Sequence, residues 1–177
     1  LPIFSIRQVR NPAVEIFLTR LKHPLEIAFG SEAFEGLDPA AIGDELAVAD
    51  AAYDNKQWDT ALSGYDAVLA KLPVYTDLEL KRGNTLQEME RYEDAIAAFE
   101  AGATANPQLR SQVDPAIARL RMQMGDFEGA EALLSSGAGG SREDLYNLGE
   151  VEFAKGDVDA AAGWYEKAAA VDPSWAK

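Results

Sequence analysis

The chain of 177 residues contains no cysteine and only one histidine, His23. Without cysteine there are no disulfide bonds, no thiolate nucleophile and no thiolate metal ligands. A single imidazole with no thiolate beside it does not make a transition-metal site. No apolar run reaches the roughly 18 residues that a membrane-spanning helix requires. The sequence therefore predicts neither a cofactor nor insertion into a membrane.

Basic residues are scarce, since 16 Lys and Arg stand against 30 Asp and Glu and leave a net charge of −14. Such a surface repels the phosphate backbone of nucleic acid and the anionic face of a membrane. Nucleic acid is therefore not the predicted partner. The excess of acidic residues has two interpretations: it keeps the protein soluble, or it lines a groove for a basic partner.

Motifs for catalysis are missing as well. Adjacent carboxylates such as Glu93–Asp94 and Glu143–Asp144 fall in the first turns of expected helices, where the helix dipole favours negative charge. Hydrolysis by two carboxylates requires them to face each other across a cleft. The glycine-rich stretch 137–140 lacks the Gly-Lys-Ser/Thr of a phosphate loop. Because the sequence contains no recognisable nucleophile–base pair, we expect that the protein is not an enzyme.

The chain is instead rich in small apolar residues that recur at a nearly constant spacing. Apolar residues make up 47 % of the sequence, and alanine, the best helix former, dominates them. Four stretches share a turn, an apolar or aromatic residue, an acidic residue and then a small residue. The small residues are separated by 34, 35 and 31 positions; they are Ala61, Ala95, Ala130 and Ala161.

Two further landmarks follow the same spacing. An aromatic residue lies four positions after the small residue in three of the stretches (Tyr65, Phe99 and Tyr165), and the third stretch has Leu134 there. A proline lies twelve positions after it, again in all but the third: Pro73, Pro107 and Pro173. The third stretch is cut short by the small residues of 135–140, which explains the short interval that follows it.

This combination resembles the tetratricopeptide repeat family. The fullest match runs from Leu145-Tyr146-Asn147-Leu148-Gly149 through Gly156-Asp157, Ala161, Tyr165 and Ala168 to Pro173. The resemblance covers about residue 40 to the C-terminus. Individual repeats depart from the pattern, because Ala49 and Ala118 stand where Gly83 and Gly149 stand in the other units.

The resemblance implies an all-α fold in which about four antiparallel helix pairs stack into a right-handed superhelix, preceded by a non-repeat N-terminal segment. We expect the array to span 39–177 and the segment to span 1–38. The fifth of the expected helices contains Asp114-Pro115, and we expect a kink or break there. The expected helices are 39–54, 58–71, 75–89, 92–105, 108–124, 127–135, 142–155 and 158–171.

The two ends of the chain differ from the repeats. Residues 1–30 carry a net charge of +2 while the remainder carries −16. Asn11-Pro12 is a good helix start, and the short stretch 25–29 could be extended. The segment has three interpretations: a cap on the first repeat, the tail of an upstream domain, or an arm that enters an acidic groove. No polar cap follows the last pair, so we expect apolar surface there, including Trp164 or Trp175.

The resemblance also implies a concave groove lined by the first helix of each pair. A known subclass clamps a C-terminal carboxylate with Lys and Asn on successive repeats, but this chain has Leu46 and Asp50 at the corresponding positions. We therefore do not expect a carboxylate clamp. The predicted groove residues are Asp50, Tyr53, Asp54, Asp77, Lys81, Asn84, Gln87, Glu88, Arg119, Tyr146, Asn147 and Glu150.

The function that follows from these expectations is a scaffold for protein–protein interaction. Its predicted ligand is a peptide or partner segment with basic residues and an apolar anchor. The alternative is a self-associating assembly module, which would use either the uncapped C-terminal end or the N-terminal arm. A homo-oligomer is the expected form in that case.

The repeat register makes a testable prediction at Ala95, the small residue of the second stretch. Ala95→Leu places a large side chain where two helices cross, and we expect it to lower the free energy of unfolding by about 1–3 kcal/mol. Chemical denaturation of the two proteins measures this difference. An unchanged unfolding midpoint would contradict the register.

Overall fold

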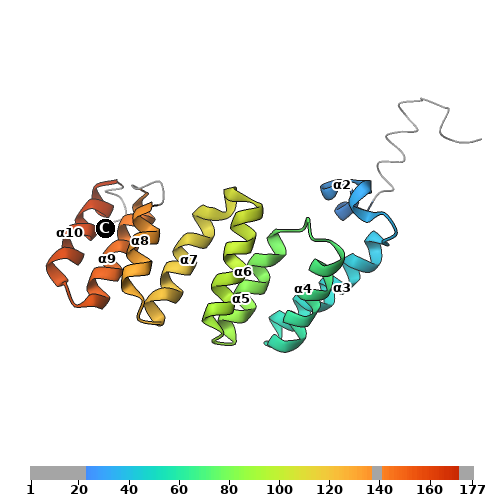
Figure 1. Ribbon diagram of the computed structural model, residues 1–177, viewed down its shortest axis with the longest axis horizontal. Helices are drawn as coiled ribbons and strands as arrows, with labels where there is room; N and C mark the ends of the chain where they lie inside the picture. The colour runs from blue at the N-terminus through green and yellow to red at the C-terminus, as the bar shows by residue number, and fades with distance from the viewer. Residues whose placement is uncertain (1–22, 137–140, 172–177) are drawn as a thin grey trace, which may run out of the picture. The chain divides into compact units, whose positions relative to one another are not determined.

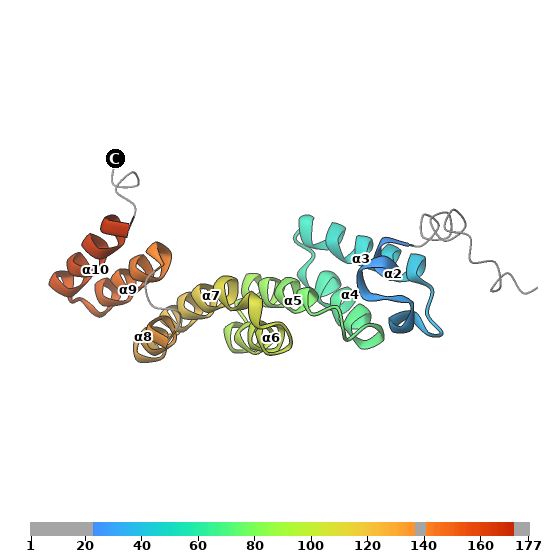
Figure 2. The ribbon, with the colours of Figure 1, turned by 90° about the horizontal axis from the view of Figure 1, so that it is seen from above.

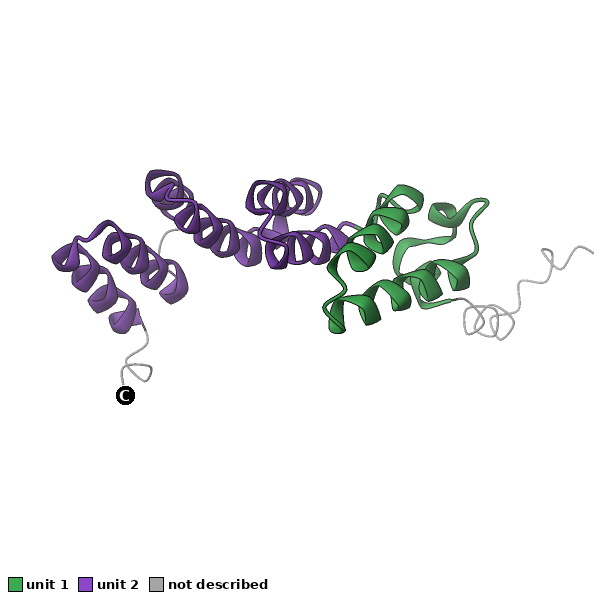
Figure 3. Cartoon of the chain, turned by 90° about the horizontal axis from the view of Figure 1, so that it is seen from below, with its two compact units in different colours: residues 1–75 green, residues 76–177 purple. Residues whose placement is uncertain are grey.

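The computed structural model describes residues 23–136 and 141–171, and every regular element within these ranges is helical. Figure 1 shows the helices in chain order. The chain divides into two compact units, residues 1–75 and residues 76–177, which are distinguished by colour in Figure 3. The predicted helix start at Asn11, the glycine-rich stretch 137–140, and Pro173 and Trp175 lie outside the described residues.

The first unit contains one predicted helix pair, α3 and α4, which pack against each other. Both helices have the predicted bounds. Lys71 at the end of α4 bridges back to Glu45 on α3, with 2.6 Å between the ammonium nitrogen and the carboxylate oxygen. The elements of this unit are α2 (Pro24–Phe29), a 3-10 turn η2 (Ser31–Phe34), α3 (Pro39–Asp54) and α4 (Trp58–Lys71).

The short helix α2 differs from the expected extended stretch. His23 caps it, since its Nδ1 accepts a hydrogen bond from the backbone amide of Leu25 at 3.3 Å. Pro24 occupies the first helical position, where its missing N–H costs no hydrogen bond. Gly30 ends the helix with φ of +82°, a conformation that favours glycine. His23 therefore begins a helix.

The described residues of the second unit, 76–136 and 141–171, form three helix pairs. In each pair the two helices lie side by side, and consecutive pairs touch through α6 with α7 and through α8 with α9. Figure 2 shows α9 beside α10 and α5 beside α6. The elements are α5 (Asp77–Glu88), α6 (Tyr92–Ala105), a 3-10 turn η3 (Pro107–Leu109), α7 (Arg110–Gln123), α8 (Phe127–Ser136), α9 (Arg142–Lys155) and α10 (Val158–Val171).

Helix α7 is continuous through Pro115, so of the predicted kink or break the break is wrong. Proline removes the N–H that would bond to the carbonyl of Ser111, one turn back. Side chains around the proline hold the first turns in place. Arg110 bridges to Asp114 on the same helix at 3.3 Å and to Glu100 on α6 at 2.8 Å. These ion pairs favour a helical conformation in the turns that precede the proline.

The turn inside each pair repeats in detail. Its central residue takes a positive φ in all four pairs: +58° at Lys56 and Glu90, +80° at Gly125 and +89° at Gly156. The next residue then donates a backbone hydrogen bond to a carbonyl in the last turn of the first helix, for example from Asp157 to Glu152 at 2.9 Å. This is the hydrogen bond of a left-handed helix end, and it accounts for the recurring turn in the sequence.

The small residues of the repeat lie where the two helices of a pair come closest. A Cβ placed on Gly83 would lie 2.6 Å from the ring of Phe99, and one on Gly149 would meet the ring of Tyr165 even closer. In the first unit the missing Cβ is on the other helix, at Gly64, where it would lie 2.6 Å from the Cβ of Ala49. Each of these three crossings thus has a glycine on one of its two helices. Because Gly64 on α4 has no side chain, α3 can carry Ala49 at the position where Gly83 and Gly149 stand in other pairs.

The last pair exposes apolar side chains, as expected, but Trp164 is not the main one. Trp164 is half-buried against the core cluster formed by residues of α7, α8 and α9, and the ammonium of Lys167 lies 3.7 Å from its ring centre. The more exposed side chains are those of Phe153, Val158 and Val171.

Gly149→Ala tests the helix crossing of the last pair. The added methyl group must displace the ring of Tyr165, so we expect the free energy of unfolding to fall by about 1–3 kcal/mol. Urea denaturation measures it. The matched control is Gly163→Ala in α10, where a Cβ meets nothing within 4 Å and where we expect a gain of about 0.4–1 kcal/mol. Equal effects at the two glycines would show that crowding at the crossing is not the cause.

Candidate binding face on the first helices

The predicted groove residues of the first unit lie on α3, in its last two turns. Asp50 accepts a hydrogen bond from the hydroxyl of Tyr65 on α4, with 2.9 Å between the oxygens. Tyr53 packs edge-on against Trp58, with ring centres 5.2 Å apart, and Asp54 is exposed. Asp50 and Tyr53 are therefore held by their own helix pair.

The five predicted residues of α5 lie on one helix of the second unit. Asp77, Asn84 and Glu88 are exposed, while Lys81 and Gln87 are half-buried. Together they place acidic, amide and basic groups along α5. The structure brings the remaining four predicted residues together on two neighbouring helices.

Helices α7 and α9, the first helices of successive pairs, line a hollow of about 250 Å³, which we call the α7–α9 hollow. Four predicted residues lie in its wall: Arg119 from α7, and Tyr146, Asn147 and Glu150 from α9. Its other lining residues are apolar: Pro115, Ala118 and Met122. The hollow thus combines an apolar floor with a cation, an amide and a carboxylate, which is the composition typical of a binding pocket.

Arg119 and Asn147 have unused hydrogen-bonding groups in this hollow. Arg119 is exposed and Asn147 is half-buried. Within residues 23–136 and 141–171, neither side chain has an ion pair or a side-chain hydrogen bond. Their donors and acceptors are therefore available to a ligand.

Glu150 is held by two tyrosines. Its carboxylate accepts a hydrogen bond from the hydroxyl of Tyr165 at 2.6 Å and a second one from Tyr146, and the two rings lie 5.4 Å apart. Burial, the hydrogen bond to Glu150 and its negative charge raise the pKa of Tyr165 well above the usual range. The hydrogen bond to Glu150, together with the negative charge of Glu150, raises the pKa of Tyr146 above its ordinary value.

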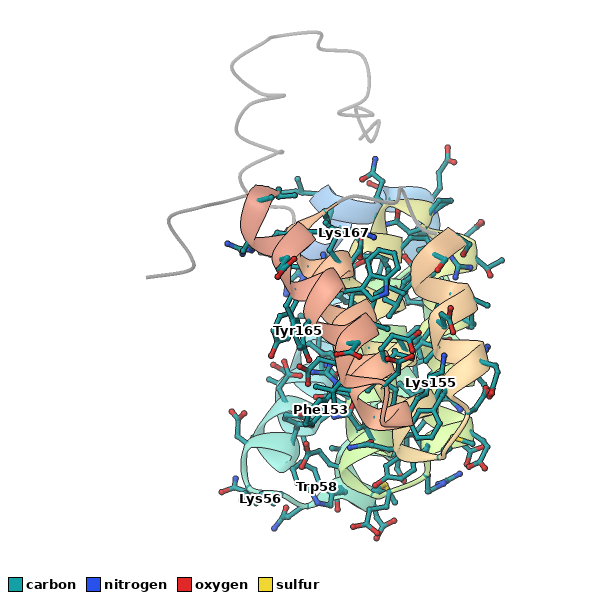
Figure 4. All side chains as sticks on the ribbon, turned by 90° about the vertical axis from the view of Figure 1, so that its left-hand side faces the viewer. Lys56, Trp58, Phe153, Lys155, Tyr165 and Lys167 are labelled. Carbon is teal, nitrogen blue, oxygen red and sulfur yellow. The ribbon has the colours of Figure 1, made fainter. Side chains whose placement is uncertain are left out.

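A second hollow lies beside the first and shares two of its residues. It is lined by Tyr146, Glu150, Phe153 and Tyr165, and we call these four residues the α9–α10 cluster. The side chain of Phe153 is 58 % exposed. Figure 4 shows Phe153 and Tyr165 on one side of the last pair, away from Lys155 and Lys167.

Sequence reasoning assigned Tyr165 to packing and missed its hydroxyl. A signal for it exists in the repeat. A carboxylate lies fifteen positions before the tyrosine in the pairs Asp50–Tyr65 and Glu150–Tyr165, and both are hydrogen-bonded. The other two pairs lack the hydroxyl and also lack the carboxylate, since Asn84 precedes Phe99 and Arg119 precedes Leu134 at the same spacing.

The described residues contain no group of three or more His, Asp or Glu side chains that could hold a metal ion. Within the same parts of the chain no helix is long and apolar enough to cross a bilayer. The α7–α9 hollow itself offers hydrogen-bonding groups, charged groups and apolar side chains.

Comparison with known proteins agrees with this arrangement of helix pairs. Residues 46–110 and 116–174 match the family model described as tetratricopeptide repeat. The chain belongs to the tetratricopeptide repeat family. The predicted all-α class and its helix pairs are thereby confirmed. Members of this family generally act as scaffolds for protein–protein interaction.

Solved structures show the same fold at low sequence identity. A structure of MamA protein is 20 % identical, with a TM-score of 0.62, over 75 % of this chain and 73 % of that one. MamA from Desulfovibrio magneticus RS-1 is 13 % identical, with a TM-score of 0.62, over 75 % and 76 %. PcrH in complex with the chaperone binding region of PopD is 20 % identical, with a TM-score of 0.52, over 77 % and 96 %. No curated protein matches the sequence.

The raised pKa of Tyr165 predicts a dependence of stability on pH. The folded state keeps a proton that the unfolded state releases above about pH 10, so this contribution is complete below that pH and is lost as the pH rises through the folded pKa. We expect the difference in unfolding free energy between the natural protein and Tyr165→Phe to stay constant from pH 7 to 9 and to shrink at higher pH. Urea denaturation at each pH measures it, with Tyr92→Phe as the control substitution. A difference that does not change above pH 10 would contradict the assignment.

Proposed function

We propose that this protein is a non-catalytic scaffold that binds a segment of a partner protein along the first helices of its repeats. The observation that carries the proposal is the α7–α9 hollow. It joins two successive repeats, and it contains the polar groups of Arg119 and Asn147 beside apolar side chains. A peptide offers both backbone hydrogen-bonding groups and apolar side chains, so it matches this combination.

The similar structures support the same kind of use. The PcrH structure contains the chaperone binding region of PopD, so a chain with this fold holds a segment of another protein there. We propose by extension that residues 39–177 form the binding array here and that residues 1–38 form a separate segment. The predicted groove residues on α3 and α5 belong to this proposal as well.

We propose further that the ligand carries basic residues and an apolar anchor. The protein has a net charge of −14, which accelerates the encounter with a basic partner. Acidic groove residues, namely Asp50, Asp54, Asp77, Glu88 and Glu150, outnumber the basic ones, Lys81 and Arg119.

A second candidate function is self-association through the last pair. The two residues equivalent to Tyr165 in the preceding pairs, Phe99 and Leu134, are each 2 % exposed, and Leu134 packs in a core cluster with Leu148 and Val151 of the next first helix. Tyr165 stays half-buried, and Phe153 beside it is exposed. A second copy of the chain is one molecule that could cover this surface.

Binding of designed peptides tests the scaffold function. Fluorescence anisotropy of the full chain with two peptide sets, one basic and apolar and one acidic and apolar, measures which set binds. We expect the basic set to bind, and we expect Asn147→Ala to weaken it about fivefold to tenfold, because a lost hydrogen bond costs roughly 1–1.5 kcal/mol.

Asn55→Ala is the matched control, since Asn55 lies in an exposed turn outside the predicted groove residues. Tighter binding of the acidic set would contradict the proposed ligand class. Equal losses in the two asparagine variants would place the peptide elsewhere on the protein.

A further inference from the structure

The α9–α10 cluster combines one carboxylate with three aromatic rings. Tyr146, Phe153 and Tyr165 line the same hollow as Glu150, and the tyrosine hydroxyls hold the carboxylate in place. Aromatic faces attract cations, and a carboxylate adds an opposite charge to the same place. An arrangement of this kind favours a cationic group over a neutral group of the same shape.

The basic residues of the last pair already have other partners. Lys155 bridges to Glu131 and Glu152, with 3.0 Å between the atoms in each case. Lys167 lies over the ring of Trp164, and Arg142 pairs with Glu143. Figure 4 shows Lys155 and Lys167 apart from Phe153 and Tyr165. Lys155 and Lys167 therefore contact partners outside the cluster.

Arg119 is the one basic side chain that shares a hollow with Glu150, and it makes no ion pair with it among the described residues. Its charge repels a cation that approaches the cluster from the α7 side. The hollow lined by Phe153 and Tyr165 has no basic residue in its lining, so a cation that approaches through it avoids this repulsion. Arg119 therefore weakens the binding of a cation at the cluster, whereas Glu150 strengthens it.

We propose that the α9–α10 cluster is the site at which an arginine side chain anchors the bound partner segment. The proposal rests on the proposed scaffold function, because it specifies which side chain of the partner the scaffold holds. A guanidinium group is planar, so it can stack on the exposed ring of Phe153. Its fork of N–H groups can donate to the carboxylate of Glu150 at the same time. A lysine ammonium is more strongly hydrated and cannot stack in this way.

A single-residue probe tests the anchor without requiring peptide binding. Acetyl-arginine amide is titrated into the full chain, and the ring resonances of Tyr146, Phe153 and Tyr165 are followed by NMR. Acetyl-citrulline amide is the neutral probe of the same shape. We expect arginine to bind about twofold to fivefold more tightly than citrulline, as exposed cation–aromatic contacts imply.

Four variants assign the effect to residues. Glu150→Gln removes the charge but keeps an acceptor for Tyr165, and Phe153→Ala removes an exposed ring; each should weaken the arginine probe about twofold to fivefold. Arg119→Gln should strengthen it by a similar factor, because a repelling charge is lost. Glu128→Gln on α8 changes the net charge by the same amount as Glu150→Gln but lies outside the cluster, and it should leave the affinity unchanged.

Equal affinities for arginine and citrulline would overturn the proposal, as would equal losses in Glu128→Gln and Glu150→Gln. Tighter binding of acetyl-lysine amide than of the arginine probe would overturn the stacked guanidinium. If peptides bind the protein but the arginine probe does not, the anchor site is wrong, while the proposed scaffold function remains supported.

Discussion

The close approach of the two helices in each pair is the constraint on which the remaining structure depends. In the pairs α5–α6 and α9–α10 an aromatic ring of the second helix lies against a glycine of the first helix, as with Phe99 against Gly83. A single pair cannot bury the resulting apolar side chains by itself. The next first helix therefore has to cover them, and this places α7 beside α9 and creates the hollow between them.

The same crossing also positions the candidate site. Because Gly149 lets the ring of Tyr165 lie against α9, the hydroxyl of Tyr165 reaches Glu150, one residue further along that helix. The carboxylate is thereby held in the wall of the α7–α9 hollow. Helix packing and the lining of this hollow thus both depend on one side chain, so a substitution at Tyr165 affects both the stability of the pair and the position of Glu150.

Much of the fold was predictable, because its signals are local in sequence. The bounds of α4 and α6 followed from a turn, a small residue and a proline that recur together. What failed depended on contacts that spacing does not show: His23 begins α2 by capping it, and α7 passes Pro115 with Arg110 tied to α6. For the candidate site, the sequence predicted residues on the first helices, and four of them line the α7–α9 hollow. The sequence could not show which of these residues lie together, because that depends on how α7 packs against α9. It could not show the role of Tyr165 either, because that role depends on a hydrogen bond between two helices.

The proposed function requires a binding face that is open to a foreign partner and is not occupied by another copy of the same chain. Light scattering coupled to size-exclusion chromatography, over a wide range of protein concentrations, tests it most directly. We expect a constant mass equal to the 19.1 kDa of one chain. A mass that rises with concentration, and that returns to one chain in Phe153→Ala, would contradict it and would show that the exposed face of the last pair serves assembly of the protein with itself.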